Sequence, residues 1–306
     1  MNVRLLSVEK IWDQAPHNAF TDLVRWRDKL YCAFREGIGH VEGNGTIRVI
    51  ALQEDNRWES VGLLECEGYD LRDAHLAVTP DDRLMVLGGA ALVTEDSRAT
   101  GTFVAFTRDA ESYSYPQIVV APGRWLWQVT WHKGRAYGVS YGGADGHPHS
   151  ALLVSDDGVA WSEHVPELFA KGWPTEATVR FDDDDTLYCL HRRDGDERSA
   201  YLGVSRPPYT EFLWHDLGRY YGGPNFMKLP GGQWIGAGRI IENKAHTTLT
   251  LIDVEAGTME PILELPSGGD TSYPGLLWHD AMLWVSYYSS HEEKTSIYLA
   301  KVQIEG

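Results

Sequence analysis

The segment DTLYCLHRRDG, residues 185–195, decides the fold, because five related segments recur along the chain. Each starts at a turn, continues as a short run containing leucine or an aromatic residue, and ends in small or aromatic residues. The other copies are DKLYCAFREG from Asp28, DRLMVLGGA from Asp82, GRAYGVSYGG from Gly134, GQWIGAGRI from Gly232 and AMLWVSYYSS from Ala281. Their third residues are Leu30, Leu84, Ala136, Leu187, Trp234 and Leu283, so successive copies are 54, 52, 51, 47 and 49 residues apart. A period of about fifty residues is the size of one four-stranded propeller blade.

The sequence around each copy supports the same architecture. A short run of β-branched or aromatic residues precedes each copy and another follows it, and both are bounded by Gly, Asp or Pro, as strands are. A fourth run follows in the first five repeats, as in WESVGLL from Trp58, but the last repeat has no room for one. We expect residues 3–12 to replace it by pairing beside residues 296–303, which would remove the open sheet edge. The sequence therefore predicts an all-β chain, with residues 1–306 forming a single six-bladed β-propeller domain of four-stranded antiparallel blades.

One turn carries a second signature of such propellers. Residues 155–161 read SDDGVAW, which matches S-x-D-G-x-x-W, a short form of the Asp-box. In this turn the Ser and Asp side chains are expected to bond the backbone and the Trp to pack beneath it. A degenerate copy lies at residues 54–58. In a propeller such turns lie away from the end of the ring that forms the binding pocket, so we expect Asp157 to have a structural role.

Composition narrows the classes of partner. The chain has 306 residues and a formal net charge of −17, and no long Lys/Arg cluster appears. Nucleic acid and anionic membranes both select a basic face, so neither is expected as a partner. No apolar run is long enough for a signal peptide or a membrane span. The three cysteines have no CxxC spacing, which fits a reducing compartment. A cytoplasmic location is therefore expected. The oligomeric state stays open.

No cofactor and no metal are expected. The chain has no HExxH sequence, no CxxC pair and no phosphate-binding glycine loop. The pair His147 and His149 lies in a Gly-rich stretch and is read as part of a loop.

The repeat register points to an anion site at the axis. Side chains at equivalent repeat positions converge in a propeller. The residues five beyond the anchors are Arg35, Gly89, Tyr141, Arg192, Arg239 and Tyr288. Unpaired cations are costly inside a protein, so three arginines at one position predict a basic cup. Guanidinium groups bind carboxylates in a bidentate manner, so the expected ligand carries a carboxylate.

The inner strands add acids, amides and aromatic residues to the same region. The predicted site residues from these strands are Asp22, Arg72, Asp73, His75, Trp127, Gln128, Glu176, Asn225 and Tyr273. Aromatic faces stack on sugar rings, while carboxylates and amides bind sugar hydroxyls. A carbohydrate is therefore the expected partner.

These residues resemble the sialidase (neuraminidase) superfamily of six-bladed propellers with Asp-box or BNR repeats. The segment from Pro174, PTEATVRFDDDDTLYCLHRRDG, is similar to the one that carries the catalytic glutamate and one triad arginine of that family. Glu176 and Arg192 occupy those places. SYPGLL, from Ser272, is similar to the segment with the catalytic tyrosine, at Tyr273. The Arg-Ile-Pro motif of the family is missing, because the matching residues are Ala19, Phe20 and Thr21.

The resemblance implies an exo-acting glycoside hydrolase for an acidic sugar. Tyr273 would be the nucleophile and Glu176 the base that takes its proton, which spares an anionic substrate a carboxylate nucleophile. Arginines would hold the sugar carboxylate, and Asp73 is the best candidate for the acid, with Asp22 and Glu36 as alternatives.

Two other functions stay open. A polysaccharide lyase would need a base such as His17, His40 or His75 beside a neutralised uronate. A glycan-binding propeller would need no catalytic group.

Overall fold

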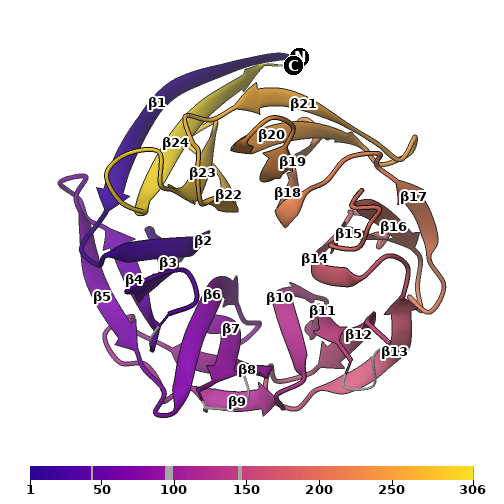
Figure 1. The fold of residues 1–306 in the computed structure, drawn as a ribbon, viewed down its shortest axis with the longest axis horizontal. Helices are drawn as coiled ribbons and strands as arrows, with labels where there is room; N and C mark the ends of the chain where they lie inside the picture. The colour runs from indigo at the N-terminus through magenta and orange to yellow at the C-terminus, as the bar shows by residue number, and fades with distance from the viewer. Residues whose placement is uncertain (43, 94–98, 144–146, 306) are drawn as a thin grey trace.

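The chain forms a ring of six four-stranded antiparallel sheets around a central axis (Figure 1). The computed structural model describes residues 1–42, 44–93, 99–143 and 147–305. No helix occurs among them, and so none that could span a membrane. The predicted fold class is confirmed.

The first three blades follow the chain in order from the axis outward. Blade one is β2 (His17–Trp26), β3 (Lys29–Gly37), β4 (Thr46–Leu52) and β5 (Trp58–Leu64). Blade two is β6 (Tyr69–Val78), β7 (Leu84–Leu92), β8 (Thr100–Thr107) and β9 (Gln117–Val120). Blade three is β10 (Arg124–His132), β11 (Arg135–Gly142), β12 (His149–Ser155) and β13 (Ser162–Phe169).

The other three blades repeat this order, except at the end of the chain. Blade four is β14 (Pro174–Phe181), β15 (Leu187–Arg193), β16 (Tyr201–Ser205) and β17 (Leu213–Asp216). Blade five is β18 (Gly222–Lys228), β19 (Trp234–Ile241), β20 (Ala245–Asp253) and β21 (Thr258–Glu264). Blade six is β22 (Thr271–His279), β23 (Met282–Ser289), β24 (Ser296–Glu305) and β1 (Asn2–Trp12).

Apolar side chains of neighbouring blades pack against each other and form the core. Trp26 and Val49 of blade one share a buried cluster with Leu76 and Phe103 of blade two. Leu152 of blade three is likewise buried against blade four. Each sheet buries both faces in this way, so the six repeats stabilise each other only as a ring.

The ring closes as predicted. β1 pairs antiparallel with β24, with Val3 opposite Ile304 and Trp12 opposite Ile297. Figure 1 shows both chain ends together at the outer edge of this blade. The first strand therefore covers an edge that would otherwise expose unpaired backbone groups.

The turn after β12 forms the hydrogen bonds expected of its sequence. Asp157 Oδ1 accepts from the backbone N–H groups of Val159 and Ala160, at 2.7 and 2.8 Å. Thr107 and Asp109 make the same arrangement in blade two, where Asp109 accepts from Glu111 and Ser112. Both turns follow the third strand of a blade, so these carboxylates fix turns and not the axial site.

Deleting residues 1–12 should leave β24 with an unpaired edge and part of the core of blade six exposed. We expect the truncated protein to aggregate or to melt far below the intact chain, as followed by circular dichroism and size-exclusion chromatography. The Glu9→Gln substitution, at an exposed position of β1, should leave the melting temperature unchanged. A truncated chain that stays monomeric with normal stability would contradict this role of β1.

Candidate active site

All six inner strands have a β-bulge at the same place, and the candidate site residues lie at these bulges. In each blade two residues of the inner strand face one residue of the next strand. The two residues at each bulge are Phe20–Thr21, Asp73–Ala74, Trp127–Gln128, Thr175–Glu176, Gly223–Pro224 and Tyr273–Pro274. Such bulges re-aim side chains and are common beside active sites.

Three of these residues adopt backbone angles that non-glycine residues rarely take. The φ angles are 61° at Phe20, 46° at Asp73 and 51° at Tyr273. Gly223, with φ of 58°, occupies the same position in blade five. Strain of this kind persists only where the surroundings enforce it, and it clusters at functional sites.

The structure brings Tyr273 and Glu176 together, although 97 residues separate them. The Tyr273 hydroxyl donates to Glu176 Oε1 at 2.5 Å. Arg192 Nη1 donates to both groups, at 2.6 Å to Glu176 Oε1 and 3.0 Å to the Tyr273 oxygen. The Gly223 N–H donates to the other oxygen of Glu176 at 2.8 Å. Glu176 and Tyr273 are 5% and 9% exposed, so this hydrogen-bonded triad is almost wholly shielded from water.

The triad keeps the glutamate charged and the phenol protonated. Burial opposes ionisation of Glu176, but the charge of Arg192 and the hydrogen bonds from Arg192, Tyr273 and Gly223 lower its pKa. Burial and the neighbouring Glu176 charge raise the pKa of Tyr273 well above its usual range. Glu176 can therefore accept a proton from Tyr273 once the phenol oxygen begins to form a bond.

Gly223 is a site residue that the sequence did not reveal. A Cβ at this position would lie 2.8 Å from the ring atoms of Tyr273. Its missing side chain therefore makes room for the tyrosine, while its N–H binds Glu176. The only signal in the sequence is the Gly222-Gly223 pair at the start of the inner strand.

Two of the three predicted arginines flank the tyrosine. Asp194 holds Arg192 in a bidentate ion pair, with N···O distances of 3.0 and 2.9 Å. The guanidinium carbon of Arg239 lies 5.3 Å from the ring centroid of Tyr273. Arg239 Nε donates to the Thr271 carbonyl and Nη2 to the Tyr288 hydroxyl, whereas Nη1 has no partner among the described residues. Arg239 thus has one amino group available to a ligand, and Tyr288 positions it.

Arg35 does not belong to this cup, contrary to the prediction. Its side chain is fully buried and donates from Nε and Nη2 to Asp70 Oδ1, at 3.0 and 2.9 Å. Its Nη1 donates to the Gly39 carbonyl at 2.8 Å. The Arg35 guanidinium is therefore held in an ion pair between blades one and two.

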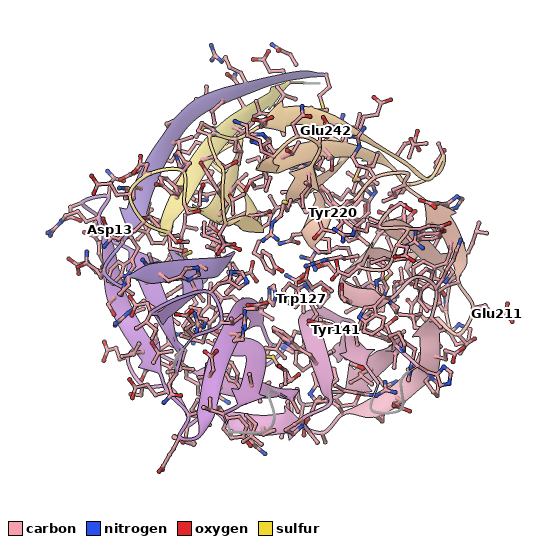
Figure 2. The ribbon with its side chains drawn as sticks, viewed as in Figure 1. Asp13, Trp127, Tyr141, Glu211, Tyr220 and Glu242 are labelled. Carbon is pink, nitrogen blue, oxygen red and sulfur yellow. The ribbon has the colours of Figure 1, made fainter. Side chains whose placement is uncertain are left out.

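Tyr220 also lies close to Arg192. Figure 2 shows Trp127 and Tyr220 near the axis, and the Arg192 guanidinium lies 5.5 Å from the Tyr220 ring.

Asp73 lies at the bulge of blade two and is 4% exposed. Its Oδ1 is buried without a hydrogen-bond partner among the described residues. Burial raises the pKa of Asp73 from 3.8 to about 6, an effect that the charge of Arg72 opposes. Arg72 itself donates to the His40 carbonyl at 3.1 Å and lies over the Phe20 ring. Asp73 can therefore stay protonated in weakly acidic solution.

Three predicted binding residues form hydrogen bonds between neighbouring blades. Asp22 accepts from the backbone N–H groups of Leu23 and Leu76, at 2.8 and 2.9 Å. Gln128 accepts from the Thr178 hydroxyl at 2.6 Å, and Asn225 donates to the Pro274 carbonyl at 2.9 Å. All three side chains are buried and their polar groups bind neighbouring residues, so a role in substrate binding stays a prediction.

Trp127 also differs from the prediction. Trp127 is 1% exposed and lies between the rings of His75 and Tyr273, at centroid distances of 4.7 and 5.6 Å. A sugar ring cannot stack on a buried indole, so Trp127 supports Tyr273 from behind. His75 is 8% exposed, its Nδ1 lies 3.5 Å from Asp22 Oδ2, and neither ring nitrogen has a hydrogen-bond partner among the described residues, so its binding role stays a prediction.

Tyr141 lies at a cavity of about 350 Å³ over blades two to four. Its ring stacks on Trp125, with centroids 5.8 Å apart. Trp173, which is 58% exposed, and Thr175 also line the cavity. Because Thr175 precedes Glu176, this aromatic cavity begins next to the triad.

Solved structures share this fold at low sequence identity. A protein of unknown function from Dyadobacter fermentans is 17% identical, with a TM-score of 0.85 and 99% of each chain covered. A Penicillium chrysogenum α-L-arabinanase, solved with arabinobiose, is 13% identical, with a TM-score of 0.73 over 97% of this chain and 98% of that one.

A Trypanosoma rangeli sialidase, solved with the inhibitor DANA, is 10% identical, with a TM-score of 0.76. The match covers 98% of this chain and 59% of the sialidase. No protein-family model and no curated protein matches the sequence. The chain therefore has the six-bladed propeller fold that arabinanases and sialidases also adopt.

The assignment of Arg35 as a structural residue predicts the effect of its loss. The Arg35→Met substitution should lower the free energy of unfolding by roughly 3–5 kcal/mol, because it leaves the buried Asp70 carboxylate without its partner. Urea unfolding measures this change. Normal stability together with weakened binding of an anionic ligand would return Arg35 to the anion site.

Proposed function

We propose that the chain is an exo-acting glycoside hydrolase that uses Tyr273 as its nucleophile. The single observation that carries the proposal is the buried hydrogen bond between the Tyr273 hydroxyl and the ionised Glu176. A phenol is a weak nucleophile unless a base lies within reach of its proton. This pair has the required distance and the required charge states.

The first step would transfer the sugar to the protein. The Tyr273 oxygen bonds to the anomeric carbon as the glycosidic C–O bond breaks, and the phenol proton passes to Glu176. Arg192, within hydrogen-bond distance of both oxygens, stabilises negative charge as it moves from the glutamate toward the phenol oxygen. Water then attacks the same carbon, and the tyrosine recovers its proton from Glu176. Two displacements at one carbon retain its configuration.

Asp73 is proposed as the proton donor for the leaving oxygen. A general acid must be protonated at the working pH, and burial gives Asp73 a pKa of about 6. In the second step the resulting carboxylate takes a proton from the attacking water. Its bulge position on the inner strand of blade two, corresponding to that of Tyr273 in blade six, turns both residues toward the axis.

An acidic sugar is proposed as the substrate. A neutral tyrosine nucleophile avoids placing a free carboxylate against an anionic substrate, and Arg239 offers its free Nη1 beside the tyrosine ring. The aromatic cavity at Trp125, Tyr141 and Trp173 can take the rest of the glycan. The solved sialidase and arabinanase structures support a glycan-acting propeller in general.

The first test is a screen of the intact protein against aryl glycosides and acidic oligosaccharides. Reducing sugar without an ultraviolet-absorbing product supports the hydrolase. An unsaturated product would show a lyase instead, and binding without turnover would show a glycan-binding protein.

On the substrate found in this way, Tyr273→Phe should lower kcat by roughly 10³-fold or more, since the variant has no nucleophilic oxygen. Tyr137→Phe is the matched control, because Tyr137 is a tyrosine that packs against Phe181 and Tyr209 outside the site. It should turn over at the normal rate. Near-normal turnover by the Tyr273→Phe variant would exclude a tyrosine nucleophile.

The pKa values predict an acidic pH optimum. The rate constant kcat/KM should rise with pH as Glu176 ionises, and should fall above about pH 6 as Asp73 loses its proton. The Asp73→Asn variant should lose the alkaline limb and should retain most activity only on aryl glycosides with a good leaving group. An alkaline limb near pH 6 that persists in this variant would assign it to another group.

A further inference from the structure

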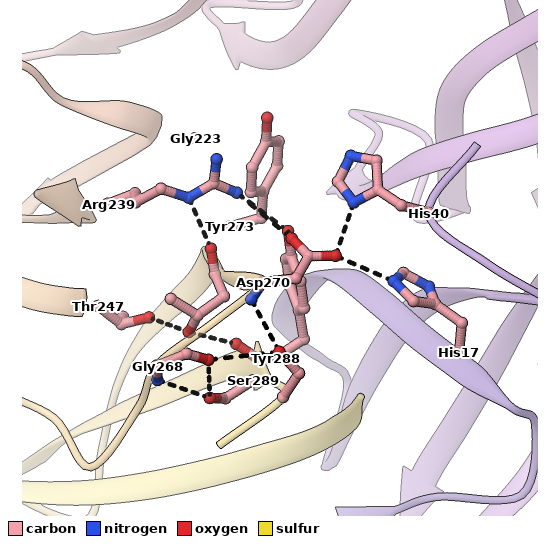
Figure 3. A network of polar contacts seen from close by, with 12 residues as sticks. His17, His40, Gly223, Arg239, Thr247, Gly268, Asp270, Tyr273, Tyr288 and Ser289 are labelled. Atoms are coloured by element: carbon pink, nitrogen blue, oxygen red, sulfur yellow. Dashed lines mark hydrogen bonds and ion pairs between the residues drawn. The ribbon is translucent and has the colours of Figure 1, made fainter. Parts of the chain in front are cut away.

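A second polar cluster, separate from the Tyr273–Glu176 pair, lies where the first and last blades meet. It consists of His17 at the start of β2, His40 between β3 and β4, and Asp270 just before β22. One donor atom of each residue lies within 4.8 Å of the other two. Figure 3 shows both histidines on one side of the Asp270 carboxylate and Arg239 on the other.

Both histidines direct a ring nitrogen at the same carboxylate oxygen. His17 Nε2 lies 3.0 Å and His40 Nδ1 2.6 Å from Asp270 Oδ2. The contact with Asp270 is the only hydrogen bond of the His17 ring, because its Nδ1 has no partner among the described residues. Three donor atoms from separate segments thus converge on one small volume.

The carboxylate is charged and held in place from its other side. Arg239 Nη2 forms an ion pair with Asp270 Oδ1, at 3.9 Å. The Tyr288 hydroxyl donates to Oδ1 at 2.8 Å, and the Asp270 N–H donates to Ser290 Oγ at 2.7 Å. Outer partners of this kind orient a metal ligand and leave its other oxygen available.

We propose that His17, His40 and Asp270 bind one divalent transition-metal ion of the Zn²⁺ class. Two imidazole nitrogens and one carboxylate oxygen are a ligand set that suits Zn²⁺, whereas Ca²⁺ and Mg²⁺ select oxygen ligands. The ion would join blade one to blade six next to the seam at which β1 closes the ring. His40 and Asp270 side chains are 45% and 27% exposed, so the ion can enter from solvent and keep positions open for water or a ligand.

Titration of the intact, metal-free protein with Zn²⁺ by isothermal calorimetry tests the site without any substrate. We expect one ion per chain, no comparable binding of Ca²⁺, and absorption bands of a His-ligated ion when Co²⁺ is used instead. The His40→Ala variant should weaken Zn²⁺ binding by about 100-fold or more, since it removes one of three ligands. His40 is half-exposed and lies outside the strands, so its loss should leave the circular dichroism spectrum of the metal-free protein unchanged.

His147→Ala is the matched control, because it also removes an exposed histidine, one that lies close in sequence to His149. His149 has its Nε2 in contact with the Arg124 guanidinium and its Nδ1 with the His147 carbonyl, so both of its ring nitrogens already have partners. Zn²⁺ binding should be unchanged in this variant. Equal Zn²⁺ affinity of the intact protein and the His40→Ala variant, or no binding by the intact protein, would overturn the proposal.

Discussion

The bulge in each inner strand is the constraint on which the site depends. Regular pairing would alternate side chains between the two faces of each sheet, into the cores between blades. Two residues opposite one break this alternation near the axis, at Asp73, Glu176 and Tyr273 among others. The ring of blades enforces the unusual backbone angles, and closure of the ring by β1 is therefore a condition for the site as well as for stability.

Burial then determines the chemistry of these groups. A carboxylate that is 5% exposed is stable only because Arg192, Tyr273 and the Gly223 N–H all bind it. Asp73 has no such set of donors, so burial favours its protonated form. Two acids in the bulges of the inner strands thus have opposite charge states, which is the separation that acid–base catalysis needs.

The spacing of the repeats was sufficient to predict six blades and the closing strand, because blade length and edge pairing depend on backbone geometry alone. It also predicted that Arg192 and Arg239 lie together, but the prediction that Arg35, at the same repeat position, joins them was wrong. Asp70, from the next blade, binds the Arg35 guanidinium, and a repeat position does not reveal such a partner. The prediction that Trp127 stacks on a sugar was wrong for a similar reason, since Trp127 occupies the bulge but neighbouring blades bury its side chain.

Covalent trapping tests the central claim most directly. A fluorinated derivative of the cleaved sugar with a good leaving group should form the glycosyl–protein species faster than water removes it. Peptide mass spectrometry after acid quench should then find the sugar on Tyr273, with one sugar per chain. A sugar attached to Glu176, or an unmodified protein after complete turnover of the reagent, would contradict a tyrosine nucleophile activated by Glu176.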